Sequence, residues 1–410
     1  MTNRTRVLYI SYNGATEPVA NSQVMPYLKG LAAKGYEIDL LTFEKKESVL
    51  RKAANAAILK KELDDSGIRW LELRYHKSPT LLATAFDILC GIVYSAYRIV
   101  RRRYDIVHAR QVVPAAMCVM LKPFFKIRWI FDMRGLVAEE YVGHGAWKEG
   151  DIKFRLVKWF EKKALMSADH IVVLTRRHKE AVESLPYMAR KDTEVSVIPC
   201  CVDTARFTPV AEDFRKEAAK RLGLPNGFIL LYLGSLGTCY FLDEMLRFFK
   251  KLKERDPEAM FLFLTNYDAA EIAAKAQTAG VEKDSVRVMF AEPSEVHRWV
   301  AQADAGIYFI NTYKKFGSCP IKTGEYLASG LPIVINAGIG DGDSFVKERK
   351  IGVVVEDFND REYEGALGKL FSLLKEDGIR DRCRRSAEES MSLSYGLDLY
   401  NGIYKSICRI

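Results

Sequence analysis

The sequence predicts an α/β protein made of two doubly wound domains. Its 410 residues are more than one hydrophobic core usually serves, so two domains of about 200 residues each are expected. Short apolar runs rich in β-branched and aromatic residues alternate with longer helical patterns along the chain. One run, residues 228–233 (FILLYL), is hydrophobic at every position, as is typical of a parallel strand covered by helices on both faces.

The expected strands form two sets. In the first half of the chain they lie near residues 6–12, 36–43, 68–75, 105–109, 127–132, 170–174 and 195–199. In the second half they lie near residues 228–234, 259–265, 286–290, 305–310, 332–336 and 351–355. Two prolines, Pro199 and Pro209, interrupt regular structure between the sets, which places the boundary within residues 196–212. We expect a first domain over residues 1–199, a second over 200–395, and a C-terminal helix near 396–410 that packs back on the first.

The distribution of charge differs between the two halves. The composition, 49% apolar and 28% charged, is that of a globular protein. Residues 1–200 hold 33 basic and 22 acidic side chains, a net charge of +11, whereas residues 201–410 hold 29 and 31, a net charge of −2. The excess in the first half favours an anionic partner there, either membrane lipid or a phosphorylated acceptor. No nucleic-acid partner is expected, because no recognised binding motif and no basic patch interleaved with aromatic residues is found.

Cysteine spacing and the first residues predict a cytoplasmic location. The eight cysteines show no C-x-x-C spacing and are expected to be reduced. The chain passes from MTNRTR directly into the first expected strand, so no signal peptide is expected.

Two helical segments bear on the membrane question. Residues 79–100 are apolar over about the length that spans a bilayer, and three arginines follow at 101–103. Asp87 and Arg98 weaken a spanning interpretation, and we favour a buried core helix over one lying on an anionic surface. Residues 152–167 combine an apolar face (Leu156, Trp159, Phe160 and Ala164) with a basic face (Arg155, Lys158 and Lys162), for which a solvated surface is favoured.

The most informative stretch is residues 316–336 (FGSCPIKTGEYLASGLPIVIN). A loop with Pro320 and Lys322 leads into a short helix carrying Glu325, and Gly330-Leu331-Pro332 stops that helix before an apolar strand. A cation and unpaired backbone N–H groups at a helix N-terminus favour a phosphate. A carboxylate one turn later is suited to the vicinal hydroxyls of a ribose. An ordinary helix-to-strand connection with a solvated Lys and Glu explains the pattern equally well.

The pattern P-x-K-x-x-E-Y-L-A-x-G-x-P resembles the nucleotide-sugar signature of the family-4 retaining glycosyltransferases of the GT-B fold, in the branch that builds cell-surface polysaccharides. Further segments resemble that family in order, at residues 17–28, 105–110, 131–135, 168–175, 197–203 and 233–238. The resemblance implies two Rossmann-like domains that face each other across a cleft. It implies transfer from a nucleoside-diphosphate sugar to a growing glycan or to an acceptor linked to polyprenyl diphosphate, with retention of configuration.

The resemblance also implies a donor site in the second domain. It assigns donor contacts to Ser318, Pro320, Ile321, Lys322, Thr323 and Glu325 in the motif; to Gly234, Ser235, Gly237 and Thr238 in the earlier turn; to Gly14 in the first domain; and to Thr265 and Glu292 at the ends of two strands. In that turn Ser235 replaces the usual Arg, and no Lys follows before Lys250. Gly317 takes the place of a Glu that often contacts the donor sugar. Lys322 thereby becomes the leading cation for the departing diphosphate, with Arg110, Arg134, Lys314 or Lys315 as helpers.

The first domain is expected to supply the acceptor side. His108 and Arg110 occupy the positions of the family's His-x-His, and Arg110 cannot act as a base there. His108 is as readily a core histidine, and Asp132 and Arg134, expected to orient the acceptor, are as readily an internal ion pair. Together with Lys322, these four residues are the catalytic candidates.

No metal-ligand spacing is found among the histidines, so metal-independent transfer without a cofactor is expected. Two rivals remain, a nucleotide-sugar 2-epimerase and a GT-B-like carbohydrate- or nucleotide-binding protein that has lost catalysis. The sequence further predicts attachment of the first domain to the inner face of the cell membrane through its basic residues, reversible and weakened by salt.

Overall fold

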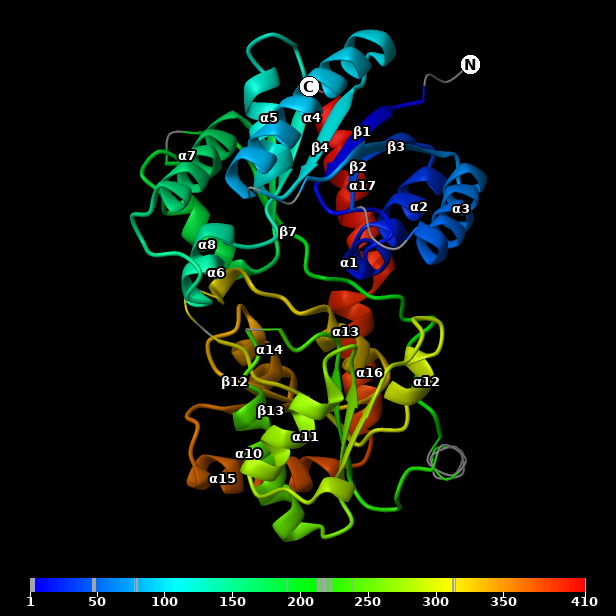
Figure 1. The fold of residues 1–410 in the computed structure, drawn as a ribbon, viewed down its shortest axis with the longest axis vertical. Coiled ribbons are helices and arrows are strands. Elements are labelled where there is room, and N and C mark those ends of the chain that lie inside the picture. Colours follow the sequence, from blue (N-terminus) through cyan, green and yellow to red (C-terminus); the bar gives the residue numbers. More distant parts are fainter. Residues whose placement is uncertain are drawn as a thin grey trace. The chain divides into compact units, whose positions relative to one another are not determined.

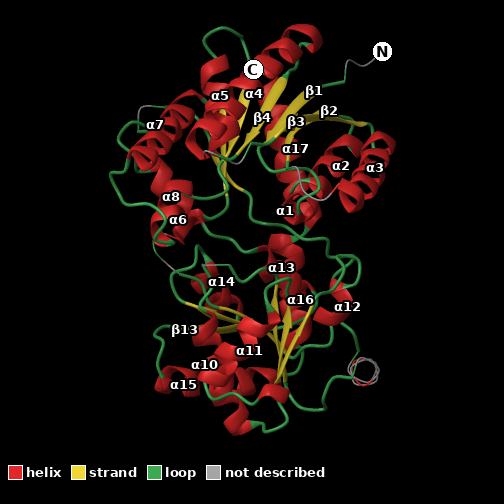
Figure 2. Ribbon diagram, viewed as in Figure 1, coloured by secondary structure: helices red, strands yellow, loops and turns green. Residues whose placement is uncertain are grey.

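The computed structural model describes residues 4–45, 49–76, 78, 80–189, 191–211, 215, 220, 223–237, 239–311, 313 and 315–409. The chain divides into two compact units, one formed by Met1–Pro199 with Gly396–Ile410 and the other by Cys200–Tyr395. Each unit is a parallel sheet covered by helices (Figure 1 and Figure 2), which confirms the predicted fold class.

The first unit contains a seven-stranded sheet in the order β3-β2-β1-β4-β5-β6-β7, and every pair of neighbours is parallel. The strands are β1 (Arg6–Ser11), β2 (Glu37–Glu44), β3 (Ile68–Arg74), β4 (Ile106–Arg110), β5 (Trp129–Asp132), β6 (His170–Val173) and β7 (Val195–Val197). All of them lie where the apolar runs predict strands. The strand order reverses direction after β3, so β4 pairs with β1 and the carboxyl ends of β1 and β4 lie side by side. In open parallel sheets such a switch point is where ligands bind.

Helices cover both faces of this sheet. They are α1 (Pro18–Gln23), α2 (Met25–Ala33), α3 (Val49–Asp65), α4 (Thr80–Arg102), α5 (Val112–Leu121), α6 (Val137–Gly143), α7 (Ile152–Ser167) and α8 (Arg176–Glu183). On one face α5 packs between α4 and α7. On the other, α17 (Leu393–Arg409) packs on α2, where Gly30 leaves room for the side chain of Leu397 and Lys34 pairs with Asp398. Figure 1 shows α17 behind the sheet and α4 and α5 in front of it.

The second unit repeats the architecture with six parallel strands in the order β10-β9-β8-β11-β12-β13. The strands are β8 (Ile229–Leu233), β9 (Met260–Leu264), β10 (Val286–Met289), β11 (Ala305–Tyr308), β12 (Ile333–Asn336) and β13 (Gly352–Val355). The helices are α10 (Leu242–Arg255), α11 (Ala269–Thr278), α12 (Val296–Val300), α13 (Ile321–Ala328), α14 (Gly342–Arg349), α15 (Asp360–Leu374) and α16 (Ile379–Met391). Every residue of β8 is buried, as its continuous hydrophobic pattern predicts.

One prediction about a helix face is wrong, and another is correct only in part. The apolar segment after residue 79 forms α4, but only 22% of its most hydrophobic window is buried, so it is not a core helix. On α7, Arg155 and Lys162 are exposed as predicted, whereas Lys158 is half-buried and forms ion pairs with Glu139 and Glu161. Sequence periodicity identified both helices, but it does not tell which face the rest of the protein covers.

Candidate functional site

In the second unit, the segment around residue 320 folds as its sequence predicts. Pro320 is the N-cap of α13, and its carbonyl oxygen accepts a hydrogen bond from the backbone N–H of Thr323 at 3.1 Å. Gly330, with φ +77°, follows the helix and allows the turn that leads into β12. Pro320, Lys322 and Glu325 therefore lie at the start of one short helix, at the carboxyl-end edge of a parallel sheet.

The ammonium group of Lys322 is enclosed by aromatic rings. Its Nζ lies 4.1 Å from the ring centroid of Tyr232, 4.0 Å from that of Tyr240 and 5.9 Å from that of Tyr308. The residue is 6% exposed, and among the described residues no hydrogen-bond acceptor faces the Nζ atom. Burial lowers the pKa of Lys322 to about 7, although the nearby carboxylate of Glu325 opposes this shift. The Lys322 ammonium thus forms no ion pair with any described residue, and a buried cation of this kind is costly unless an anionic group pairs with it.

The turn after β8 lies against this cation. Gly234 and Gly237 adopt φ values of +98° and +50°, a backbone conformation that favours glycine. A Cβ atom placed on Gly234 would lie 3.8 Å from Nζ of Lys322. The turn therefore has a cation beside it even though Ser235 replaces the family's arginine. Lys322 reaches the turn from α13.

Tyr326, in the same motif, holds the turn in place. Its hydroxyl accepts a hydrogen bond from the backbone N–H of Leu233 at 2.8 Å and donates to the carbonyl of Leu231 at 3.3 Å. Its ring lies across Gly306 of β11, where any side chain would overlap it. The tyrosine of the motif thus connects α13 to the end of β8.

Glu325 lies one turn beyond Lys322. Burial raises the pKa of its carboxyl group to about 7, and the charges of Lys322 and Arg206 only partly oppose this shift. The side chain is half-buried. A polar ligand that donates hydrogen bonds to the carboxylate would favour its ionised form.

The other donor candidates lie in different surroundings. The Thr323 hydroxyl forms a hydrogen bond with the Tyr308 hydroxyl at 2.7 Å, and that of Thr265 accepts from the backbone N–H of Tyr267 at 3.0 Å. Ser318, Pro320 and Ile321 are half-buried around the start of α13. Glu292 is exposed, and its carbonyl caps the turn that precedes α12. Thr238 and Lys314 lie outside the described residues, as does the side chain of Lys315.

In the first unit the acceptor-side candidates converge at the carboxyl ends of β4 and β5. Asp132 is buried, and its carboxylate lies 3.6 Å from Arg110 and 3.5 Å from Arg134. Burial alone would raise the pKa of Asp132, but the two guanidinium groups and His108 hold it well below its usual range. The side-chain oxygen of Gln23 accepts from Arg110 at 2.9 Å and from Arg134 at 3.5 Å. Two guanidinium groups therefore lie around one carboxylate.

His108 has a partner on each ring nitrogen. Nδ1 lies 2.8 Å from the Tyr404 hydroxyl and Nε2 lies 3.5 Å from Asp132. Burial lowers the pKa of His108, so the ring is neutral near pH 7. Tyr400 donates a hydrogen bond to Asp132 at 3.2 Å, so two tyrosines of α17 support this cluster. These contacts favour a supporting role for His108 within the first unit.

Gly14 has a structural reason for lacking a side chain. A Cβ atom there would lie 2.7 Å from the carboxylate of Glu44, which accepts a hydrogen bond from the backbone N–H of Ala15 at 2.6 Å. Its assignment as a donor contact stays a prediction.

Sequence reasoning missed the aromatic residues around Lys322 and the side chains that support Asp132. The available signal was weak, because Tyr232, Tyr240 and Tyr308 fit the pattern of ordinary core residues. Gln23 lies within the segment that resembles the family's first helix, but no recognised motif assigns a role to its side-chain amide. Among the residues that the structure describes, no three His, Cys, Asp or Glu side chains are grouped so as to hold a metal ion.

Comparison with known families agrees with this arrangement. Residues 20–201 match the family model "Glycosyl transferase 4-like domain", and residues 214–390 match "Glycosyl transferases group 1". The chain belongs to the GT-B glycosyltransferases. The two matches meet near the division between the two units, so each unit corresponds to one half of the GT-B fold.

Individual relatives are distant. The D-inositol 3-phosphate glycosyltransferase of Salinispora arenicola is 24% identical over 292 residues, which cover 68% of this chain and 62% of that protein. Sucrose-phosphate synthase from Thermosynechococcus elongatus has a TM-score of 0.76 at 15% identity, covering 98% of this chain and 99% of that one. Anabaena HepE in complex with UDP-glucose has a TM-score of 0.68 at 12% identity, covering 98% of this chain and 100% of that one. At these identities the structural likeness shows the fold.

Proposed function

We propose that this glycosyltransferase takes its sugar from a nucleoside-diphosphate donor bound by the second unit and retains the anomeric configuration. The observation that carries the proposal is the buried Lys322 ammonium beside the Gly234 turn. A diphosphate bound beside this turn would pair its negative charge with the Lys322 ammonium. HepE, a distant structural neighbour, was crystallised with UDP and with UDP-glucose, which supports a nucleotide-sugar donor.

The two charged residues of α13 have different proposed tasks. Lys322 stabilises the negative charge that grows on the diphosphate as the glycosidic bond breaks. Glu325 accepts hydrogen bonds from the two ribose hydroxyls and so fixes the nucleoside. For a retaining reaction, the departing phosphate takes the acceptor proton on the same face of the sugar, so no carboxylate nucleophile is required. The transfer is proposed to be independent of a metal ion.

The first unit is proposed to bind the acceptor through the cluster of Arg110, Asp132 and Arg134. Its two guanidinium groups suit an acceptor with an anionic group, such as a glycan carrier linked to polyprenyl diphosphate in surface polysaccharide synthesis. The proposed location is the cytoplasm, at the inner face of the cell membrane.

Thermal shift with a panel of UDP, GDP, ADP and TDP sugars tests the donor proposal, because a ligand bound only by the folded protein raises the apparent melting temperature. We expect one nucleoside diphosphate to raise it, with and without EDTA, and Glu325→Gln to reduce the rise. A panel in which no nucleotide shifts the transition would refute donor binding.

A further inference from the structure

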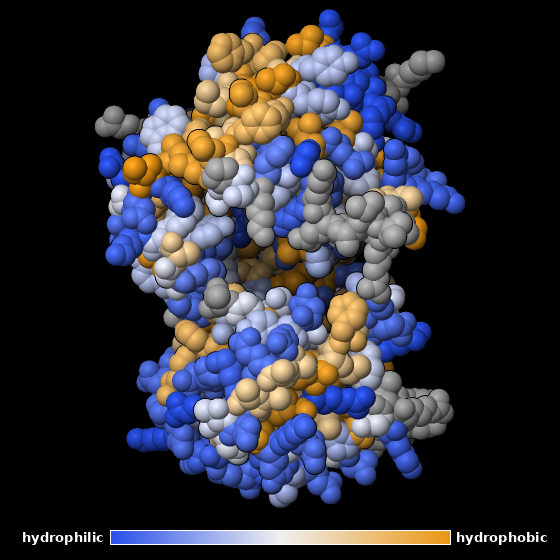
Figure 3. Space-filling view, viewed as in Figure 1, coloured by the Kyte–Doolittle hydropathy of each residue, from blue (hydrophilic) through white to orange (hydrophobic). Residues whose placement is uncertain are grey.

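Helix α4 exposes the side chains that its sequence suggested were buried. Leu82, Phe86, Leu89, Val93, Tyr97 and Val100 recur at helical spacing on one side of the helix, and Val93 is 62% exposed. No charged residue interrupts this stripe, which at 1.5 Å per residue runs for about 27 Å. Figure 3 shows hydrophobic side chains gathered over α4 on the face seen in this view. Soluble monomers rarely expose continuous apolar surface of this extent.

The opposite side of α4 is firmly built into the first unit. Gly91 allows close packing on Met117 of α5. Asp87 is buried and accepts hydrogen bonds from the Tyr12 hydroxyl at 2.9 Å and from the backbone N–H of His76 at 3.0 Å. A helix with one side bonded to the protein in this way cannot cross a bilayer alone, but it can lie on one.

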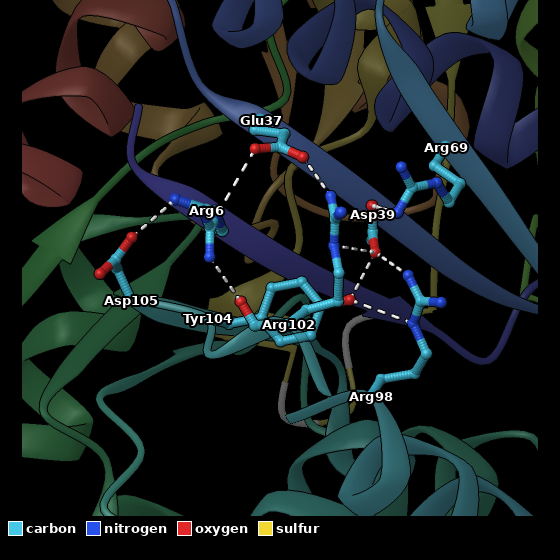
Figure 4. A network of polar contacts seen from close by, with 8 residues as sticks. All are labelled: Arg6, Glu37, Asp39, Arg69, Arg98, Arg102, Tyr104 and Asp105. Atoms are coloured by element: carbon cyan, nitrogen blue, oxygen red, sulfur yellow. Dashed lines mark hydrogen bonds and ion pairs between the residues drawn. The ribbon is translucent and has the colours of Figure 1, made fainter. Parts of the chain in front are cut away.

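A polar network fixes the C-terminal end of α4 to the sheet. Figure 4 shows Arg98 and Arg102 of α4 pointing toward Asp39 and Glu37 of β2, with which they form ion pairs. Tyr104 also donates a hydrogen bond to Asp39. Of the arginines at this end, Arg101 and Arg103 are the exposed ones, so cations border the apolar stripe without entering it.

The apolar surface continues beyond α4. Neighbouring exposed residues are Met120 and Phe124 at the end of α5, and Ile152, Leu156, Trp159 and Met166 on α7. On α7 they alternate with exposed basic residues, and the Lys163 ammonium lies 5.7 Å from the Trp159 ring centroid. We call these twelve residues, six on α4 and six beyond it, the apolar face of the first unit.

We propose that the apolar face docks onto an anionic lipid bilayer, with α4 lying in the plane of the membrane and its stripe inserted at the boundary between headgroups and acyl chains. Tryptophan and tyrosine near the edge suit that boundary, because their rings are apolar and their N–H and O–H groups polar. The surrounding arginine and lysine residues complement anionic headgroups.

Charge argues against a second copy of the chain as the occupant. The exposed charged residues at this face are mostly basic: Arg101 and Arg103 after α4, and Lys153, Arg155, Lys162 and Lys163 on α7, against the exposed Asp151. A symmetric dimer through this face would place like charges opposite each other. A bilayer of anionic lipid presents the opposite charge.

The inference rests on the proposed function in one respect: docking would bring the first unit to a lipid-linked acceptor. Docking through the apolar face also predicts a weaker salt dependence of membrane binding than attachment through basic residues. Attachment through basic residues alone would be lost at high salt, whereas inserted apolar side chains are not screened.

Co-sedimentation of the full chain with vesicles tests the inference. The probes are vesicles of phosphatidylcholine alone and of phosphatidylcholine mixed with phosphatidylglycerol, each at low and high salt. Val93→Glu places a charge in the stripe, and Ile58→Glu is the matched control, because Ile58 is 59% exposed on α3. Circular dichroism and thermal melting check that both variants are folded.

We expect the unaltered chain to bind the mixed vesicles and to remain largely bound at high salt. Val93→Glu should weaken partitioning by about tenfold or more, since burying one such side chain contributes on that scale. Ile58→Glu should bind normally, and a blue shift of tryptophan emission on vesicle addition should be missing in Trp159→Phe. Equal binding by the two glutamate variants, complete release by salt, or a Val93→Glu effect confined to self-association without vesicles would each overturn the inference.

UDP binding measured on the same preparation separates this result from the donor proposal. A chain that binds UDP but no vesicles refutes docking alone, and a chain that binds vesicles but no nucleotide refutes the donor proposal alone.

Discussion

Replacing Lys322 by methionine tests whether the buried ammonium group of Lys322 binds the diphosphate of the donor. The free protein keeps Lys322 among tyrosine rings with its pKa lowered to about 7 by burial. At pH 8 only about a tenth of the molecules therefore carry the ammonium. Binding of a diphosphate beside it favours the charged form, so the protein should take up close to one proton per nucleotide at pH 8. At pH 6 Lys322 is already charged, and loss of the Glu325 proton on binding should dominate instead.

Isothermal titration calorimetry with UDP, or with the nucleotide selected in the panel, measures this uptake from the heats in buffers of different ionisation enthalpy. Lys322→Met should remove the uptake and lower kcat about a hundredfold, the usual scale for one preorganised electrostatic contact. Lys369→Met is the matched control, because Lys369 is an exposed residue on α15 of the same unit. Undiminished proton uptake in Lys322→Met would refute the assignment. An increase in KM with unchanged kcat would show that Lys322 contributes to donor binding but not to stabilisation of the transition state.

The same substitution should stabilise the free protein at low pH. The folded-state pKa of Lys322, about 7, lies below its ordinary value of 10.5, so the unfolded chain binds the proton more tightly. This cost to folding is fully present below pH 7 and disappears as pH rises toward 10.5. A shift of this size corresponds to roughly 5 kcal/mol.

We therefore expect Lys322→Met to raise the free energy of unfolding at pH 6, by at most roughly 5 kcal/mol, and to add progressively less above pH 7. Urea unfolding at a series of pH values measures this difference. A variant that is less stable than the parent at pH 6 would contradict the reasoning.

Three further changes test other parts of the account. Glu325→Gln should raise the donor dissociation constant about tenfold or more, because charge-assisted hydrogen bonds to the ribose contribute roughly 1.5–3 kcal/mol; unchanged affinity in calorimetry would remove Glu325 from the site. Asp132→Ala leaves two buried guanidinium groups without this carboxylate and should lower the free energy of unfolding, measured by urea titration, by about 3–5 kcal/mol. A decrease in that free energy of less than about 1 kcal/mol would show that the cluster is solvated. Gly306→Ala should displace the Tyr326 ring and cost roughly 1–3 kcal/mol; an unchanged melting temperature would contradict the packing described for β11.

The sequence predicted the strands because strands buried on both faces are continuously hydrophobic, as in residues 228–233. It also predicted the helix of α13 and its two charged residues, since Pro320 and Gly330 mark the ends of that segment. It did not predict the orientation of α4. An apolar stripe at helical spacing looks the same whether it faces a core or a membrane, and the buried side of α4 carries Asp87, Gly91 and Ser95, which no hydrophobicity pattern identifies as inward-facing.

The surroundings of Lys322 could not be predicted for a different reason. Its three tyrosines come from β8, from the segment before α10 and from β11, and only the pairing of β8 with β11 brings them together. In the same way Asp132 meets Tyr400 across 268 positions of sequence. Contacts of this kind depend on strand order, which local patterns do not contain.

The most direct test of the central claim is product analysis with the nucleotide sugar selected by the binding panel and an acceptor linked to polyprenyl diphosphate. Nuclear magnetic resonance gives the anomeric configuration of the new linkage, and a coupled assay follows the release of nucleoside diphosphate. The account predicts release of one diphosphate per sugar transferred, a product with the configuration of the donor, and turnover about a hundredfold slower in Lys322→Met. An inverted product would contradict the retaining mechanism, and donor binding without release of diphosphate toward any acceptor would identify a binding protein instead of an enzyme.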